Sequence, residues 1–186
     1  VVHPTKAGLK IPQIFDAAIN REVKALWIIG EDVVQTDPNS AHVAKAMNAL
    51  DLLVVQEIFM SETAKHADVV LPGTTFLEKD GTFTNTERRV QRVNKAAEPL
   101  PGTKPDGLIV TEMMQKLGYN QKSYDADEVL AEIADVVPFF KGITRERLGK
   151  LGLQWPVKED GTDTKILHEK EFKLGKGRIK YFDFKE

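Results

Sequence analysis

Ala25-Leu26-Trp27-Ile28-Ile29-Gly30 is the stretch that decides the fold. A continuous apolar run of this length, ended by a glycine, is typical of a strand that is buried on both faces. Leu52-Leu53-Val54-Val55 is a second such run, and Pro38-Asn39-Ser40 between them gives the start signals of a helix. Two buried strands joined by a helix form a βαβ unit, so they should be parallel with a right-handed crossover.

The pattern continues outward from this unit. Residues 11–21 have the apolar spacing of an amphipathic helix, and Asp68-Val69-Val70-Leu71 indicates a third short strand before Pro72. Residues 81–94 are polar and β-branched without a helical period, which predicts an irregular hairpin or an extended loop. Three further helices are predicted: one opened by Pro105 and stopped at Gly118, one from Asp125 that continues until Pro138, and one from Thr144 through Leu151. Asp125 and Glu128 have the spacing of a capping box. A loop-rich stretch over 157–178 and a terminal strand over 179–184 follow.

This order of elements predicts an α/β fold: a Rossmann-like three-layer sandwich with a mostly parallel sheet, followed by helices and a loop-rich C-terminal tail. We expect the α/β domain to cover residues 1–152, and residues 153–186 to form an extended tail or linker. A chain of 186 residues has room for one sizeable core and an appendage.

Composition excludes several classes of function. The formal net charge of −2 argues against a broad nucleic-acid surface. No apolar run approaches the ~20 residues of a membrane span, and no signal peptide is visible, so we expect a cytoplasmic protein. The absence of cysteine excludes disulfides, thiolate nucleophiles and cysteine-ligated iron–sulfur clusters within this chain. The four histidines lack metal-ligand spacing, so no metal site is expected.

Polar side chains follow the ends of all three predicted strands. Gly30-Glu31-Asp32 follows the first, Gln56-Glu57 the second, and Gly73 to Gln91 the third. Ligands of doubly wound sheets bind outside the carboxyl ends of the strands. A carboxylate placed there can accept paired hydrogen bonds from a guanine edge or a ribose diol. Helix capping or a solvated loop is the alternative reading of the same carboxylates.

The segment around the third strand is rich in groups that suit phosphate. Lys79 is a compact point charge, and Thr63 carries a hydroxyl donor, although a surface lysine and ordinary turn chemistry are the alternative readings. If residues 86–91 are extended, Arg88 and Arg89 point to opposite faces, so at most one joins a given site. We expect the other to form a structural ion pair, with Glu78 or Glu87 as candidate partners. No P-loop, G-x-G-x-x-G motif or Ser-His-Asp arrangement occurs, so the sequence predicts a binding surface and no catalytic residue.

Four motifs in order resemble the molybdopterin oxidoreductase superfamily, of the dimethyl sulfoxide reductase type. They are residues 26–32 (LWIIGED), 54–64 (VVQEIFMSETA), 67–72 (ADVVLP) and 78–91 (EKDGTFTNTERRVQ). Within the superfamily, the chain most resembles the formate dehydrogenase alpha (catalytic) subunit, on residues 153–156 (LQWP), 166–168 (ILH) and 175–177 (GKG). Nitrate reductases and the large iron–sulfur subunit of complex I are similar in the same region.

The resemblance implies a cofactor and its binding residues. The family enzymes hold molybdenum or tungsten between two molybdopterin guanine dinucleotides, and the matched region is similar to their third, α/β domain, which binds the nucleotide end of one of them. Lys79 would then meet a phosphate or a nearby polar edge, and Asp106 would bond the guanine base. The other residues implied to contact the nucleotide follow the first two strands: Gly30, Glu31, Asp32, Gln56 and Glu57.

An activity and partners are also implied. The intact enzyme would oxidise formate to carbon dioxide with two electrons, which leave through iron–sulfur clusters. The remainder of the catalytic subunit and electron-transfer subunits would be its partners. The cluster cysteines, the Cys or selenocysteine that ligates the metal and the final cofactor-binding barrel have no counterpart here, so we expect a fragment that is inactive alone. A non-catalytic nucleotide- or cofactor-binding module, an assembly module and a structural domain without ligand are the alternatives.

Overall fold

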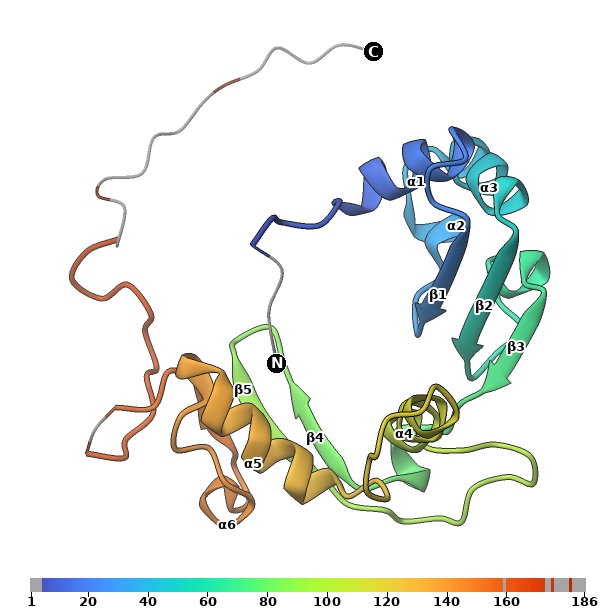
Figure 1. The fold of residues 1–186 in the computed structure, drawn as a ribbon. Coiled ribbons are helices and arrows are strands. Elements are labelled where there is room, and N and C mark those ends of the chain that lie inside the picture. Colours follow the sequence, from blue (N-terminus) through green and yellow to red (C-terminus); the bar gives the residue numbers. More distant parts are fainter. Residues whose placement is uncertain (1–4, 159, 173–174, 176–180, 182–186) are drawn as a thin grey trace. The chain divides into compact units, whose positions relative to one another are not determined.

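The computed structural model describes residues 5–158, 160–172, 175 and 181. It is a mixed α/β structure, as the sequence predicts, with a parallel sheet, a small antiparallel sheet and helices (Figure 1). The chain forms two compact units: unit 1 consists of Val1–Asp80 and Val93–Tyr124, and unit 2 of Gly81–Arg92 and Asp125–Glu186. The expected domain boundary after residue 152 stays a prediction.

A three-stranded parallel sheet is the centre of unit 1 (Figure 1). Strands β1 (Ala25–Ile29), β2 (Leu52–Glu57) and β3 (Val69–Pro72) lie in the order β1-β2-β3. The parallel pairing that the sequence predicts for the first two strands is therefore confirmed. The expectation that the first run is buried on both faces is wrong for this structure, because every residue of β1 is partly or largely exposed.

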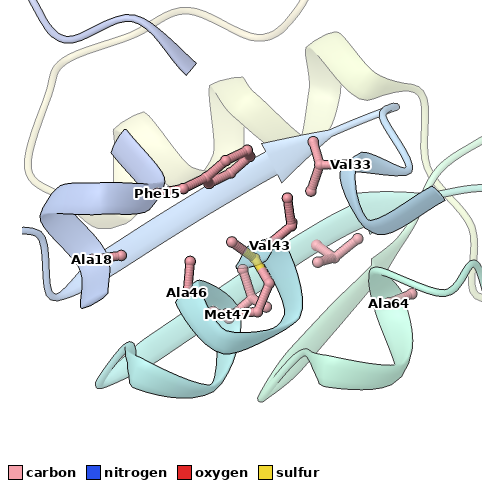
Figure 2. Close-up of a cluster of buried hydrophobic side chains, with 9 residues drawn as sticks. Phe15, Ala18, Val33, Val43, Ala46, Met47 and Ala64 are labelled. Carbon is pink, nitrogen blue, oxygen red and sulfur yellow. The ribbon is translucent and has the colours of Figure 1, made fainter. Parts of the chain in front are cut away.

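Helices cover one face of this sheet. They are α1 (Ile11–Ile19), α2 (Val33–Thr36), α3 (Ser40–Ala49) and the 3-10 helix η1 (Ala64–His66). Their apolar side chains pack on Leu53 and Val55 of β2, which places the core of unit 1 on this side. Figure 2 labels the helical members of the core: Phe15, Ala18, Val33, Val43, Ala46, Met47 and Ala64.

The chain returns to the parallel sheet just before the last helix of unit 1. The 3-10 helix η2 (Phe76–Glu78) follows β3, and α4 (Asp106–Lys116) begins after Pro105. The Lys104 N–H donates to the Pro72 carbonyl at 3.1 Å, so the residues before α4 run beside the end of β3. Helix α4 ends before Gly118, whose φ of 88° fits the predicted helix stop.

Unit 2 contains the antiparallel sheet. Strands β4 (Gly81–Thr84), β5 (Arg89–Val93) and β6 (Leu153–Gln154) lie in that order, so the segment predicted as an irregular hairpin or an extended loop contains two neighbouring strands. Helix α5 (Ala126–Val136) starts at the predicted cap, and η3 (Pro138–Phe140) and α6 (Arg145–Leu148) follow it. Helix α6 is shorter than predicted because Gly149, with a φ of 51°, ends it.

The core of unit 2 is small. Val90, Leu130, Ile143 and Leu148 are its buried members. Apart from Tyr181, the terminal strand predicted over 179–184 lies outside the described residues. In the part of the chain that the structure describes, no helix has the length and apolar character needed to cross a membrane.

Candidate functional site

The carboxyl ends of the three parallel strands lie next to one another in unit 1. The Gly30 N–H donates to the Gln56 carbonyl at 2.9 Å, and the Gly73 N–H donates to the Glu57 carbonyl at 3.1 Å. Gly30 has a φ of 62°, a conformation that glycine adopts without steric cost. The polar segments that follow the strands therefore start side by side, as the parallel topology predicts.

Three side chains near these strand ends form one hydrogen-bonded group, which we name the strand-end cluster: Gln56 from β2, Lys79 from the segment after β3, and Asp106 from the start of α4. The buried Gln56 donates its Nε2–H to Asp106 Oδ1 at 2.8 Å. Lys79 forms an ion pair with Asp106 and also donates to the Thr74 carbonyl at 3.2 Å. Asp106 is the first residue of α4, where the helix dipole favours a negative charge.

Asp106 is a charged acceptor. Burial works to raise the pKa of its carboxyl, but hydrogen bonds from Lys79 and Gln56 and the charge of Lys79 outweigh burial and hold that pKa below its usual range. An ionised carboxylate only accepts hydrogen bonds. Because its side chain is still 39% exposed, Asp106 has room for donors from a ligand in addition to those from the protein.

Two buried polar atoms adjoin the strand-end cluster without a hydrogen-bond partner among the described residues: Gln56 Oε1 and Thr74 Oγ1. A buried polar group left unsatisfied costs about 1–3 kcal/mol. Gln56 Oε1 belongs to the amide that binds Asp106, and Thr74 is the residue whose carbonyl binds Lys79. A side chain at the neighbouring Gly73 would crowd the Asp106 carboxylate, since a Cβ there would lie 3.1 Å from Asp106 Oδ1.

Thr74 was missed by the reasoning from sequence. It stands next to Thr75 after Pro72 and Gly73, and both threonines are ordinary turn residues by composition. The structure separates them: Thr75 pairs with Glu78 at 2.9 Å, whereas Thr74 is 2% exposed and its hydroxyl lacks a partner in the described chain. No signal in a single sequence distinguishes the two.

Asp32 and Thr63 form a second polar pair at the strand ends. The fully buried Thr63 donates its N–H at 2.9 Å and its hydroxyl at 2.6 Å to Asp32 Oδ1, and its hydroxyl accepts from the Val34 N–H at 3.0 Å. Burial works to raise the pKa of the Asp32 carboxyl, but hydrogen bonds from Thr63 and from Glu62 outweigh burial and lower that pKa. This pair ties the segment after β1 to the segment after β2. Contact of either residue with a cofactor stays a prediction.

The other predicted carboxylates make short-range contacts. Glu31 Oε1 accepts from the Thr36 hydroxyl at 2.7 Å, and Glu57 Oε1 accepts from the Ile58 N–H at 2.7 Å. Neither is joined to the strand-end cluster by a hydrogen bond in the described structure. These local contacts are those expected for the alternative, structural role of both carboxylates. Their contact with a nucleotide stays a prediction.

The two adjacent arginines have structural contacts within unit 2. Arg88 donates to the carbonyls of Trp155 and Thr164, the latter at 3.0 Å, and its guanidinium lies 5.5 Å from the centre of the Trp155 ring. Arg89 pairs with Glu87 at 2.9 Å. The predicted structural ion pair of one arginine is therefore confirmed for Arg89 and Glu87.

The site is suited to binding. Acceptors, one cation and the start of a helix lie together, and this arrangement can hold the donor-rich edge of a heterocycle or an anion. Within the residues that the structure describes, no three His, Cys, Asp or Glu side chains gather as a metal site requires.

Known proteins are similar to this chain over most of its length. The F420-dependent formate dehydrogenase subunit alpha of Methanocaldococcus jannaschii is 46% identical over 95% of this chain and 26% of that protein. The F420-dependent formate dehydrogenase 2 subunit alpha of Methanococcus maripaludis is 46% identical over 94% of this chain and 26% of that protein. The chain thus spans about a quarter of the length of these relatives.

Structural and profile comparisons agree with these relatives. Acetylene hydratase from Pelobacter acetylenicus matches 56% of this chain and 15% of its own with a TM-score of 0.52 at 25% identity. Residues 3–116 match the sequence profile of the molybdopterin oxidoreductases, which is more than half of the chain and includes the whole strand-end cluster. This chain therefore belongs to the molybdopterin oxidoreductase family.

Proposed function

We propose that this chain is the part of a molybdopterin-dependent formate dehydrogenase that holds the guanine nucleotide end of the pterin cofactor, and that it does not catalyse alone. The strand-end cluster is the observation that carries the proposal. Its place outside the carboxyl ends of parallel strands is where α/β sheets bind nucleotides. The family name implies a molybdopterin cofactor, and the relatives are formate dehydrogenase alpha subunits.

The acceptors fit a guanine edge. Guanine presents a ring N–H and an exocyclic amino group on one side, and the partly exposed Asp106 carboxylate has two oxygens to receive them. Gln56 Oε1 and the Thr74 hydroxyl are polar atoms whose hydrogen-bonding capacity the described residues leave unused. Charge-assisted hydrogen bonds contribute about 1.5–3 kcal/mol each, so two or three of them anchor one end of a dinucleotide firmly.

Lys79 would meet the phosphates. In this structure it neutralises Asp106, and its side chain is 23% exposed. An ammonium group is a compact charge that turns readily between acceptors, so it can serve Asp106 and a nearby phosphate oxygen together. Gly30, Glu31, Asp32, Glu57 and Thr63 would border the nucleotide from the two neighbouring strand ends.

For the whole enzyme we propose oxidation of formate to carbon dioxide, with electrons passing to iron–sulfur clusters and partner subunits outside this chain. The relatives' names support the substrate and the subunit character. When bound, the metal and its pterins supply the two-electron chemistry, with molybdenum or tungsten as the metal. The residues of this chain bind and orient the cofactor. A cytoplasmic location belongs to the same proposal.

Metal content of the full-length enzyme tests the role of this site. Lys79→Ala and Asp106→Ala should each lower the molybdenum or tungsten bound per protein several-fold. Lys65→Ala is the matched control, because Lys65 is a surface lysine paired with Glu62. Melting temperatures measured on the same samples separate lost cofactor from lost folding. Normal metal content in both site variants would refute the proposal.

A further inference from the structure

Glu78 joins two segments of unit 1 that meet beside the strand-end cluster. It is the last residue of η2 and directly precedes Lys79. The Thr75 N–H and the Thr75 hydroxyl each donate to Glu78 Oε2 at 2.9 Å. The Leu100 N–H donates to the other oxygen, Oε1, at 3.0 Å. One carboxylate therefore connects η2 to a backbone group that lies 22 positions further along the chain.

The contact between Glu78 and Thr75 is local and has an ordinary explanation. The two residues form a capping box, in which a threonine and a glutamate three positions later satisfy backbone N–H groups at the start of a helical turn. That motif explains one oxygen of Glu78. The hydrogen bond from Leu100 to the second oxygen lies outside the motif, so the carboxylate has a role beyond capping η2.

The segment that Glu78 holds leads directly to Asp106. The Leu100 carbonyl accepts from the Thr103 N–H at 3.0 Å and from the Thr103 hydroxyl at 2.8 Å, which makes a tight turn. The chain then runs beside the end of β3, and α4 begins at Asp106. The position of Leu100 therefore helps to set where the carboxylate of the strand-end cluster lies.

The other member of the ion pair, Lys79, is fixed from both sides. After it, Asp80 Oδ1 accepts from the Lys95 N–H at 3.1 Å. The two neighbours of Lys79 thus bind backbone N–H groups of the same segment, residues 94–105 between β5 and α4. The backbone of Lys79 is extended, with a φ of −143° and a ψ of 154°, so its side chain points away from those of Glu78 and Asp80.

The hydrogen bonds of Glu78 are charge-assisted. Donation from the Thr75 N–H and hydroxyl, with a further bond from Leu100, holds the pKa of the Glu78 carboxyl below its usual range against the effect of burial. The group is therefore ionised at neutral pH, and an ionised acceptor binds its donors more strongly than a neutral one. A lysine side chain is long and flexible, so the place of its ammonium group depends on how firmly its backbone is held.

We propose that Glu78 is a positioning residue of the cofactor site: by holding Thr75 and Leu100 on its two oxygens, it keeps Lys79 beside Asp106. Glu78 does not itself contact the nucleotide, because both of its oxygens already accept donors from the protein. It acts through Lys79. This inference rests on the proposed function of the strand-end cluster and adds a residue that the cluster depends on.

A double-mutant cycle on the full-length enzyme tests the inference, with the molybdenum or tungsten bound per protein as the measurement. Glu78→Ala and Lys79→Ala should each lower the metal content several-fold. The double variant should retain as much metal as Lys79→Ala alone, within about twofold, because a residue that acts through Lys79 has nothing left to position. Independent, merely structural losses would instead multiply to more than about tenfold. Glu98→Ala is the control, since the Glu98 side chain is 88% exposed and pairs with Lys95.

The outcomes separate this inference from the proposed function. Metal loss in Lys79→Ala with normal metal in Glu78→Ala, or with losses that multiply in the double variant, would overturn the role of Glu78 and leave the proposed function standing. Normal metal in Lys79→Ala would overturn both. If Glu78→Ala does not fold, Glu78→Gln carries the same cycle, because its single carbonyl oxygen cannot replace both carboxylate oxygens.

Discussion

Lys79 and Asp106 form an ion pair although 27 positions separate them in the chain. Strands β4 and β5 lie between them in sequence. The return of the chain is fixed by hydrogen bonds from the N–H groups of Ala96 and Ala97 to the Leu77 carbonyl, at 2.7 and 2.9 Å. The strand-end cluster therefore depends on these hydrogen bonds to the Leu77 carbonyl as well as on the strands themselves.

Acid should weaken the fold partly through Asp106. Its pKa is lowered in the folded state, so the charged carboxylate stabilises the protein above the unfolded pKa of about 3.9, and this contribution disappears as the pH falls through the folded pKa. On acidification from about pH 5 to about pH 3, which brackets the ordinary aspartate pKa of about 4, the melting temperature of Asp106→Asn should fall less than that of the parent. Melting curves across this range provide the measurement, and equal losses in both proteins would contradict the assignment.

Thr63→Val should destabilise unit 1 by roughly 1–3 kcal/mol, because it removes a buried hydroxyl, so that the Val34 N–H loses its acceptor and Asp32 loses one of its donors. Thr63→Ser keeps the hydroxyl and is the control. Urea unfolding measures both variants. If valine is tolerated as well as serine, the hydroxyl does not hold the two strand-end segments together.

Leu53 and Leu52 offer a matched test of which sheet face is the core. Leu53 is 1% exposed and packs under the helices, whereas Leu52 is 42% exposed. We expect Leu53→Ala to lower the free energy of unfolding by about 2–5 kcal/mol and Leu52→Ala to lower it by much less in this chain. Denaturant titration gives both values, and similar losses would mean that the opposite face is also packed.

Arg88→Lys should destabilise unit 2 by roughly 1–3 kcal/mol, since a lysine cannot bind the carbonyls of Trp155 and Thr164 together and loses the planar contact with the Trp155 ring. Arg89→Lys keeps a charge opposite Glu87 and should cost less. Fluorescence in a Trp27→Phe background, where Trp155 is the one remaining tryptophan, reports on the unfolding of this unit. Equal stability of the two variants would show that the charge alone matters.

Much of the fold follows from local patterns. Apolar runs and start signals predict the βαβ unit, and the cap at Asp125 accepts hydrogen bonds from the Asp127 and Glu128 N–H groups at 2.9 Å, as capping-box spacing predicts. The exposure of β1 could not be predicted. An apolar run has the same sequence whether or not a neighbour covers it.

The candidate site was predictable in part. Strand-end placement indicates Gln56, and the family resemblance adds Lys79 and Asp106, which the structure joins to it. Glu31 and Glu57 follow strand ends equally well, yet their contacts are local, because position along a chain does not fix side-chain direction. The role of Thr74 depends on burial, which only the three-dimensional arrangement reveals.

A structure of the full-length enzyme with its cofactor bound tests the central claim most directly. We predict that the guanine of one pterin dinucleotide lies within hydrogen-bond distance, about 2.7–3.2 Å, of the Asp106 carboxylate, with Gln56 beside it and Lys79 near a phosphate. A guanine bound elsewhere, with Asp106 still paired only with Lys79 and Gln56, would contradict it.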